Sequence, residues 1–118
     1  MIAHICEQWA WEEAQEDKEY RADSLDTVGF IHCSRPEQVL EVANRYYIDV
    51  PDLLLLWIDP AKVYAEIRWE SSDGEIFPHI YGSLNIDAVT VVTGLLPDEN
   101  GEFTRLRLRP WTRNHPTK

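Results

Sequence analysis

Short stretches of alternating or continuous apolar residues recur along the chain, and each predicts one strand. Residues 53–58, Leu-Leu-Leu-Leu-Trp-Ile, form a continuous apolar run whose length suits a strand buried on both faces. Residues 64–70 alternate instead, which places Glu66, Arg68 and Glu70 on one face. The pattern predicts about six short strands, the last at a sheet edge, from seven candidate segments: residues 2–6, 30–32, 53–58, 64–70, 77–81, 88–95 and 105–109.

Two longer segments in the first half of the chain have helical spacing. Residues 7–17 repeat apolar positions at helical intervals, without Gly or Pro. A second helix is predicted from Ser34 to about residue 47. There, Ser34 would cap the backbone, Pro36 suits the first turn and Glu37 can return the capping bond.

The order of these elements predicts the fold class. Both helices lie in the first half, which favours an α+β fold with a mixed or antiparallel sheet over a doubly wound one. The length of 118 residues suits a single domain covering residues 1–118, with 110–118 as a loosely ordered tail.

Charge and composition narrow the expected partners. The chain has 11 Lys and Arg against 21 Asp and Glu, a formal net charge of −10, so binding to nucleic-acid phosphates is not expected. No apolar run approaches the roughly 18–20 residues of a membrane span, and the N-terminus lacks a signal-peptide pattern. Two cysteines make no disulfide framework. We therefore expect a cytoplasmic protein, a monomer or weak homodimer, with no membrane partner.

Two histidine segments are the main candidates for a functional site, residues 29–34 (Gly-Phe-Ile-His-Cys-Ser) and 77–82 (Phe-Pro-His-Ile-Tyr-Gly). Residues two apart in a strand share a face, so His79 and Tyr81 would lie about 7 Å apart and could hold a substrate between them. Imidazole can donate, accept or shuttle a proton near neutral pH. Glu70 ends a predicted strand before the loop that leads to His79, where a carboxylate could act as a base.

Other interpretations of the same residues stay open. The helix start after His32 offers free N–H groups, a plausible anion-binding spot that includes Ser34. His79 and Tyr81 could equally be half-buried strand residues, with Glu70 a surface carboxylate. A nucleophilic hydrolase would use Cys33, which follows a strand. A metal site is not predicted, because no CxxC or HxxxH pair accompanies the zinc-type ligands His4, Cys6, His32, Cys33 and His79.

The order of several motifs resembles a bacterial family catalogued as domain of unknown function 952. The resemblance covers roughly residues 1–105 and depends on Trp11, Tyr20, Gly-Phe-Ile-His-Cys-Ser at 29–34, Gln38-Val39, Arg68-Trp69-Glu70 and Phe-Pro-His-Ile-Tyr-Gly-Ser-Leu at 77–84.

This family's fold is similar to that of the ADP-ribosyltransferases, a strongly bent, split sheet with a cleft for NAD. The resemblance implies a His on the first core strand, here His4 or His32, with Tyr81 stacking on nicotinamide and Glu70 bonding the ribose. The functional hypothesis is therefore a domain that binds NAD or a related nucleotide. Its catalytic residues would be Glu70 and His79, and its ligand-binding residues would be His32, Ser34, Arg68 and Tyr81. The alternative is a non-catalytic peptide- or protein-binding module that uses the same cleft.

Overall fold

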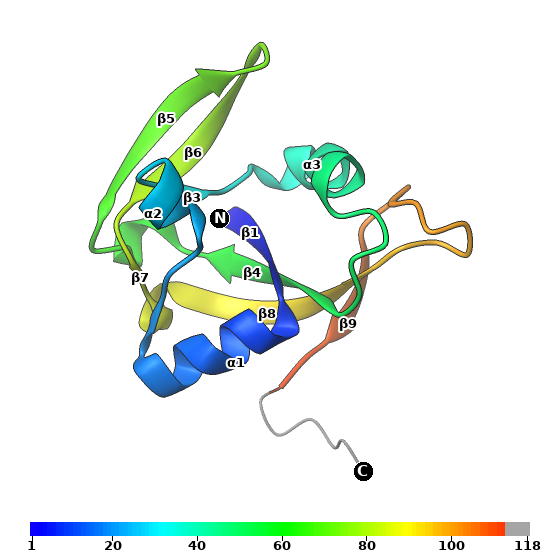
Figure 1. The fold of residues 1–118 in the computed structure, drawn as a ribbon, viewed down its shortest axis with the longest axis horizontal. Coiled ribbons are helices and arrows are strands. Elements are labelled where there is room, and N and C mark those ends of the chain that lie inside the picture. Colours follow the sequence, from blue (N-terminus) through cyan, green and yellow to red (C-terminus); the bar gives the residue numbers. More distant parts are fainter. Residues whose placement is uncertain (113–118) are drawn as a thin grey trace.

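A four-stranded antiparallel sheet lies at the centre of the computed structural model, which describes residues 1–112 (Figure 1). Its strand order is β1-β4-β8-β9, and every pairing in it is antiparallel. The apolar run predicted as a doubly buried strand is β4, which lies between β1 and β8 as expected. The bounds are Ile2–Glu7 for β1, Leu53–Ile58 for β4, Val89–Leu96 for β8 and Arg107–Pro110 for β9.

A second, three-stranded sheet projects from this body as the long β5–β6 hairpin with β3 at its side (Figure 1). The order is β3-β6-β5, again antiparallel, with β3 at Ile31–His32, β5 at Glu66–Ser72 and β6 at Glu75–Tyr81. A two-residue pair joins β2 (Glu19–Tyr20) to β7 (Leu84–Asn85). The α+β class is confirmed, and the described strand pairs are antiparallel rather than mixed.

The helices differ from prediction mainly at their starts. Helix α1 spans Gln8–Asp17, while the second predicted helix begins as a 3₁₀ turn at Pro36–Gln38 and continues as α3 over Val39–Tyr46. The expectation that Ser34 caps this helix is wrong. The backbone of Ser34 pairs with Ala3 of β1 through two hydrogen bonds of 2.8 Å, and Arg35 takes the N-cap position instead.

Besides β2 and β7, further short elements were not predicted. The segment between β2 and β3 contains α2 at Ser24–Thr27, and 3₁₀ turns occur at Pro60–Lys62 and Ile86–Ala88. Among the described residues, no helix is both long and apolar enough to cross a membrane. The predicted tail begins within β9, and its residues 113–118 lie outside the described part of the chain.

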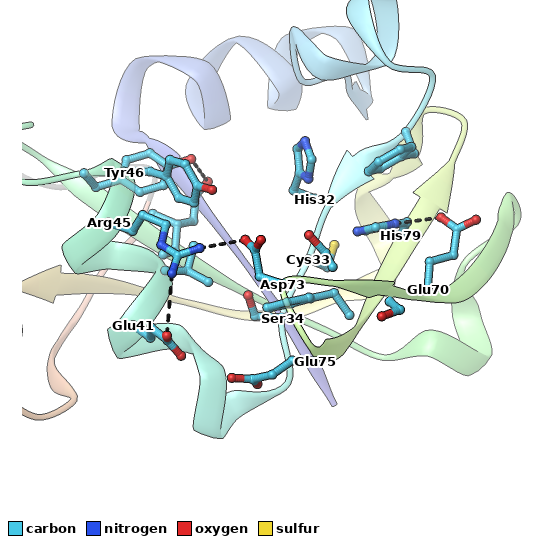
Figure 2. Close-up of a pocket in the computed structure, with 17 residues that line it drawn as sticks. His32, Cys33, Ser34, Glu41, Arg45, Tyr46, Glu70, Asp73, Glu75 and His79 are labelled. Carbon is cyan, nitrogen blue, oxygen red and sulfur yellow. Dashed lines mark hydrogen bonds and ion pairs between the residues drawn. The ribbon is translucent and has the colours of Figure 1, made fainter.

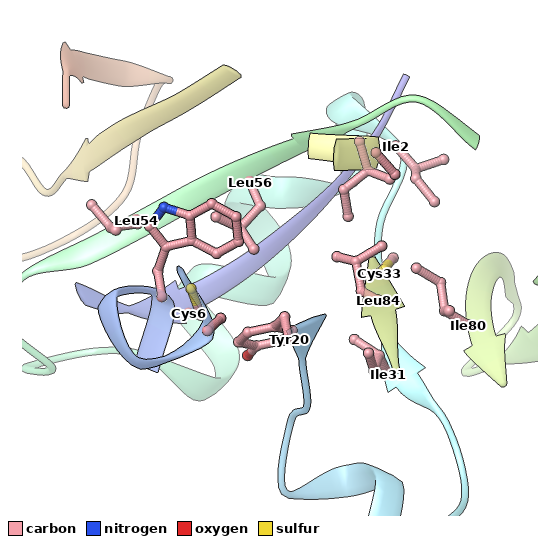
Figure 3. Close-up of a cluster of buried hydrophobic side chains, with 13 residues drawn as sticks. Ile2, Cys6, Tyr20, Ile31, Cys33, Leu54, Leu56, Ile80 and Leu84 are labelled. Atoms are coloured by element: carbon pink, nitrogen blue, oxygen red, sulfur yellow. The ribbon is translucent and has the colours of Figure 1, made fainter. Parts of the chain in front are cut away.

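Apolar side chains on the two faces of the central sheet form two cores. Alternate residues of β4 point to opposite faces, so that Leu54 and Leu56 join one core and Leu53 and Leu55 the other. The first core adds α1 through Trp11 and Ala14 and includes side chains of the second sheet, such as Ile31 and Ile80 (Figure 3). The second core adds Val39 and Ala43 of α3. Helices α1 and α3 therefore cover opposite faces.

Candidate functional site

One face of the β3-β6-β5 sheet carries the histidines and the carboxylate singled out in the sequence. His79 of β6 is paired with His32 on one side and with Arg68 on the other. Glu70 pairs with Phe77 and lies two residues after Arg68 in β5, on the same face of the sheet. Since directly paired residues point to the same side of a sheet, strand register alone gathers these side chains.

Glu70 is the polar centre of this face. Its Oε1 accepts a hydrogen bond of 2.7 Å from the Tyr81 hydroxyl and lies 2.7 Å from Nδ1 of His79. The bonds from His79 and Tyr81 lower the pKa of Glu70, and the bond to the carboxylate raises the pKa of Tyr81.

An ionised Glu70 fixes the tautomer of His79. Because a carboxylate can only accept, Nδ1 of His79 carries the proton and donates it to Glu70, and Nε2 of the neutral ring is left as an acceptor. Figure 2 shows that Nε2 points away from Glu70, towards the cavity. His79 is only 6% exposed, so its orientation is held by burial as well as by this bond.

Phe30 packs against both histidines. Its ring stacks on His79 at a centroid distance of 4.0 Å and meets His32 edge-on at 4.8 Å. The two imidazoles are 5.6 Å apart, and burial, followed by the neighbouring His79, lowers the pKa of His32. Phe30 lies in the first histidine segment but was not among the individual site residues predicted from the sequence. The signal was its position two residues before His32, which places it on the same side of an extended chain.

These groups border a cavity of about 730 Å³, which lies between α3 and the β5–β6 hairpin. A volume of this order is typical of small-molecule sites. Arg45 of α3 reaches across to Asp73 in the β5–β6 turn at 2.8 Å and lies 3.9 Å from Glu41 (Figure 2). Charged lining side chains are one guanidinium, Arg45, and four carboxylates: Glu41, Glu70, Asp73 and Glu75.

The sequence did not predict the contribution of α3. Glu41, Arg45 and Tyr46 belong to the helix that follows the first histidine segment, and the packing of α3 beside the β5–β6 hairpin brings them to the cavity next to the second segment. Glu75 also lines the cavity and accepts a hydrogen bond of 3.0 Å from Gln38.

Four of the six predicted site residues line the cavity: His32, Ser34, Glu70 and His79. The other two are not part of its lining. Tyr81 and His79 do not hold a space between them, because both bond the same oxygen of Glu70. Arg68 lies 4.2 Å above the ring of Tyr81 and pairs with Glu66 at 3.1 Å.

The remaining candidates of the sequence analysis have buried, structural environments. His4 is 6% exposed, and its nitrogens lie within bonding distance of the His32 carbonyl and the Tyr20 hydroxyl. Cys33 lines the cavity, but burial raises the pKa of its thiol, which disfavours the thiolate a nucleophile needs. Within residues 1–112, no group of three His, Cys, Asp or Glu side chains could hold a metal ion.

Comparison with known proteins places the chain in a family. It belongs to the family described as protein of unknown function DUF952, whose model matches residues 5–92. It is similar to the crystal structure of protein CC0527 from Caulobacter crescentus, with 29% identity over 86% of this chain and 90% of that chain and a TM-score of 0.79. The solution NMR structure of CC0527 gives 30% identity, 87% and 90% coverage and a TM-score of 0.75. No curated protein matches the chain.

Proposed function

We propose that the cavity beside the β3-β6-β5 sheet binds a small organic ligand and that His79 exchanges a proton or a hydrogen bond with it. The observation that carries this proposal is the Glu70–His79 pair, 2.7 Å apart, with Nε2 of His79 directed into a cavity of about 730 Å³. A carboxylate that orients an imidazole and stabilises its protonated form is the arrangement of general acid–base sites. Glu70 is then a positioning residue for His79.

The charge of the lining supports a neutral or cationic ligand. Four carboxylates face one guanidinium, so each phosphate group on a ligand would meet repulsion. Within the ADP-ribosyltransferase-like hypothesis, this favours the nicotinamide riboside half of NAD, which carries a positive pyridinium ring, as the part that enters the cavity. Phe77 and the exposed Tyr46 offer aromatic surfaces for such a ring. NAD itself would need its phosphates to remain outside.

A charge series of ligands tests the proposal. Isothermal calorimetry would compare nicotinamide riboside, nicotinamide mononucleotide and NAD on the same protein. We expect the riboside to bind most tightly and each phosphate to weaken binding by several-fold.

Replacement of His79 tests which residue the ligand contacts. His79→Gln should weaken binding of the riboside by at least about tenfold, the equivalent of one lost hydrogen bond to a buried polar group. The matched control is Arg68→Gln, on the same sheet face but outside the cavity lining. Absence of binding by all three ligands up to about 1 mM would overturn the nicotinamide assignment. Equal weakening in both variants would overturn the role of His79.

The alternative from the sequence, a non-catalytic peptide- or protein-binding module that uses the same cleft, stays a prediction.

A further inference from the structure

Strand β5 has one open edge. It is the last strand in the order β3-β6-β5, and the β5–β6 hairpin projects from the body of the molecule with β5 along its outer side (Figure 1). Its side chains are exposed on both faces of the sheet, at Arg68 on one and Trp69 on the other. An edge strand of seven residues is a template for pairing with a further strand.

The backbone of β5 presents hydrogen-bonding groups to this edge. The carbonyl of Pro78 accepts from the N–H of Cys33 at 3.1 Å, so the backbone of Pro78 faces β3. Trp69 is opposite Pro78, and this pair therefore has no backbone hydrogen bonds. The N–H and C=O groups of Trp69, and those of Ile67 and Ser71 on either side, point away from β6. Within the described part of the chain, no other strand reaches them.

The charges along β5 are self-complementary in one register. Glu66, Arg68 and Glu70 share a face and alternate in sign. In an antiparallel pair of β5 strands that is symmetric about Trp69, Arg68 of each copy lies opposite the partner's Glu70. Symmetry about Arg68 or Glu70 would instead place like charges opposite each other, which is destabilising. Symmetry about Ile67 or Ser71 would leave more than half of the seven residues unpaired.

Both faces of the strand suit this register. The outward groups of Trp69 make its pair with the partner's Trp69 a hydrogen-bonded one, so Arg68 and the partner's Glu70 form the closer kind of pair, with Cα atoms about 4.5 Å apart. Oε1 of Glu70 is occupied by His79 and Tyr81, and its second oxygen can accept from the partner's guanidinium. On the other face, the two Trp69 side chains, each 51% exposed, would shield one another from water.

We propose that a second copy of this chain binds the open edge of β5, antiparallel and symmetric about Trp69, so that two β3-β6-β5 sheets join into one continuous sheet. Such an interface is isologous, the usual form in soluble homodimers. The backbone edge, the alternating charges and the exposed indole all select the same register. The inference goes beyond ligand binding and does not rest on it, because all three observations concern β5 and its outer edge.

A pair of charge reversals tests the register. Arg68→Glu and Glu70→Arg each place like charges opposite each other in a dimer of the single variant. In a mixture of the two variants, each carboxylate again faces a guanidinium, so a mixed dimer is favoured. The matched controls, Arg105→Glu and Glu99→Arg, make the same changes of charge outside the strands. Circular dichroism establishes that each variant is folded, and sedimentation velocity measures its association.

We expect the wild type and both controls to dimerise increasingly between about 5 and about 500 µM. Each reversal alone should weaken dimerisation by at least about tenfold, and an equimolar mixture should restore it. In the wild type, the amides of Ile67, Trp69 and Ser71 should gain protection from hydrogen exchange as the concentration rises. The amides of Arg68 and Glu70, which already face β6, should change much less.

A wild type that stays monomeric over this range would overturn the proposal. Folded variants that do not associate on mixing would overturn the register, and equal losses in the controls would show a general charge effect instead. If a reversal prevents folding, amide exchange in the wild type decides alone, since unchanged protection at Trp69 excludes pairing at this edge. Calorimetry of the wild type with nicotinamide riboside is independent of each outcome, so the two proposals fail separately.

Discussion

The two ring nitrogens of His4 have different partners, and together these fix its protonation. Nδ1 faces a carbonyl, that of His32, which can only accept, so Nδ1 carries the proton. Nε2 of a neutral ring must then accept from the Tyr20 hydroxyl, 2.8 Å away. Burial lowers the pKa of His4 from 6.5 to about 4. His4 is therefore neutral, and its hydrogen bond connects β1 to the backbone of His32 in β3.

This histidine should make the stability depend on pH. Its pKa is lower in the folded protein than in the unfolded chain, so the unfolded chain binds the proton more readily. The contribution to stability is complete above pH 6.5 and is lost as the pH falls from 6.5 towards 4. When the pH falls from about 7.5 to about 5, the lowered pKa of His4 should reduce the unfolding free energy by about 2 kcal/mol.

Urea denaturation of the wild type and of His4→Gln at both pH values measures this effect. The amide retains a donor and an acceptor but does not titrate, so the variant should show a clearly smaller loss at low pH. Both measurements stay above the range in which Glu70 is protonated. Equal pH dependence in the two proteins would exclude His4 as its source.

At the residue scale, strand periodicity is enough to predict which candidate side chains share one face of a sheet. His79 and Glu70 meet because of their register in a hairpin whose strands were recognised. The role of Tyr81 was not predictable, because which partner a phenol selects depends on distances across the sheet. His4 and His32 could not be distinguished either, since burial and not residue type makes one structural and leaves the other at the cavity.

At the element scale, α3 is tied to the β5–β6 hairpin by one buried amide. Nε2 of Gln38, a residue only 3% exposed, donates to the carbonyl of Ile76 and to Glu75, both at 3.0 Å, while its Oε1 accepts from the backbone N–H of Arg35 at 2.9 Å. This pattern explains why the predicted helix start was wrong. Ser-x-x-Glu resembled a capping box, but the backbone of Ser34 joins β1 and the capping role passes one residue along.

Removal of that amide should destabilise the protein more than removal of the ion pair that joins the same elements. Gln38→Ala removes a buried amide together with its hydrogen bonds to the Ile76 carbonyl, to Glu75 and from the Arg35 N–H, which should cost about 2 kcal/mol or more. Asp73→Asn removes the exposed pair with Arg45 and should cost less than about 1 kcal/mol. Asn also tolerates the positive φ of 52° at this position.

Chemical denaturation of the two variants gives the comparison directly. If Asp73→Asn proved the more destabilising of the two, the exposed ion pair rather than the buried amide would be what holds the hairpin beside α3.

At the scale of the whole molecule, two cores share one sheet. The strand pattern predicted β4 as doubly buried, but not which helix covers which face, because that depends on the direction the chain takes after each strand. Since Leu55 and Leu56 are adjacent in β4 yet belong to different cores, the cores are joined through the backbone of a single strand. One domain over residues 1–118 stays a prediction, and the shared strand offers a way to test it.

A single domain should unfold as one cooperative unit whichever core is weakened. Leu55→Ala and Leu56→Ala each remove a fully buried side chain and should lower the unfolding free energy by about 2–5 kcal/mol. Native-state hydrogen exchange can follow the amide of Ala14 in α1 and of Ala43 in α3, which report on different cores. In either variant the exchange free energies of both amides should fall together, because β4 contributes buried side chains to both cores. If Leu56→Ala lowered protection at Ala14 and left Ala43 unchanged, the two faces would be separate folding units and the single-domain prediction would be wrong.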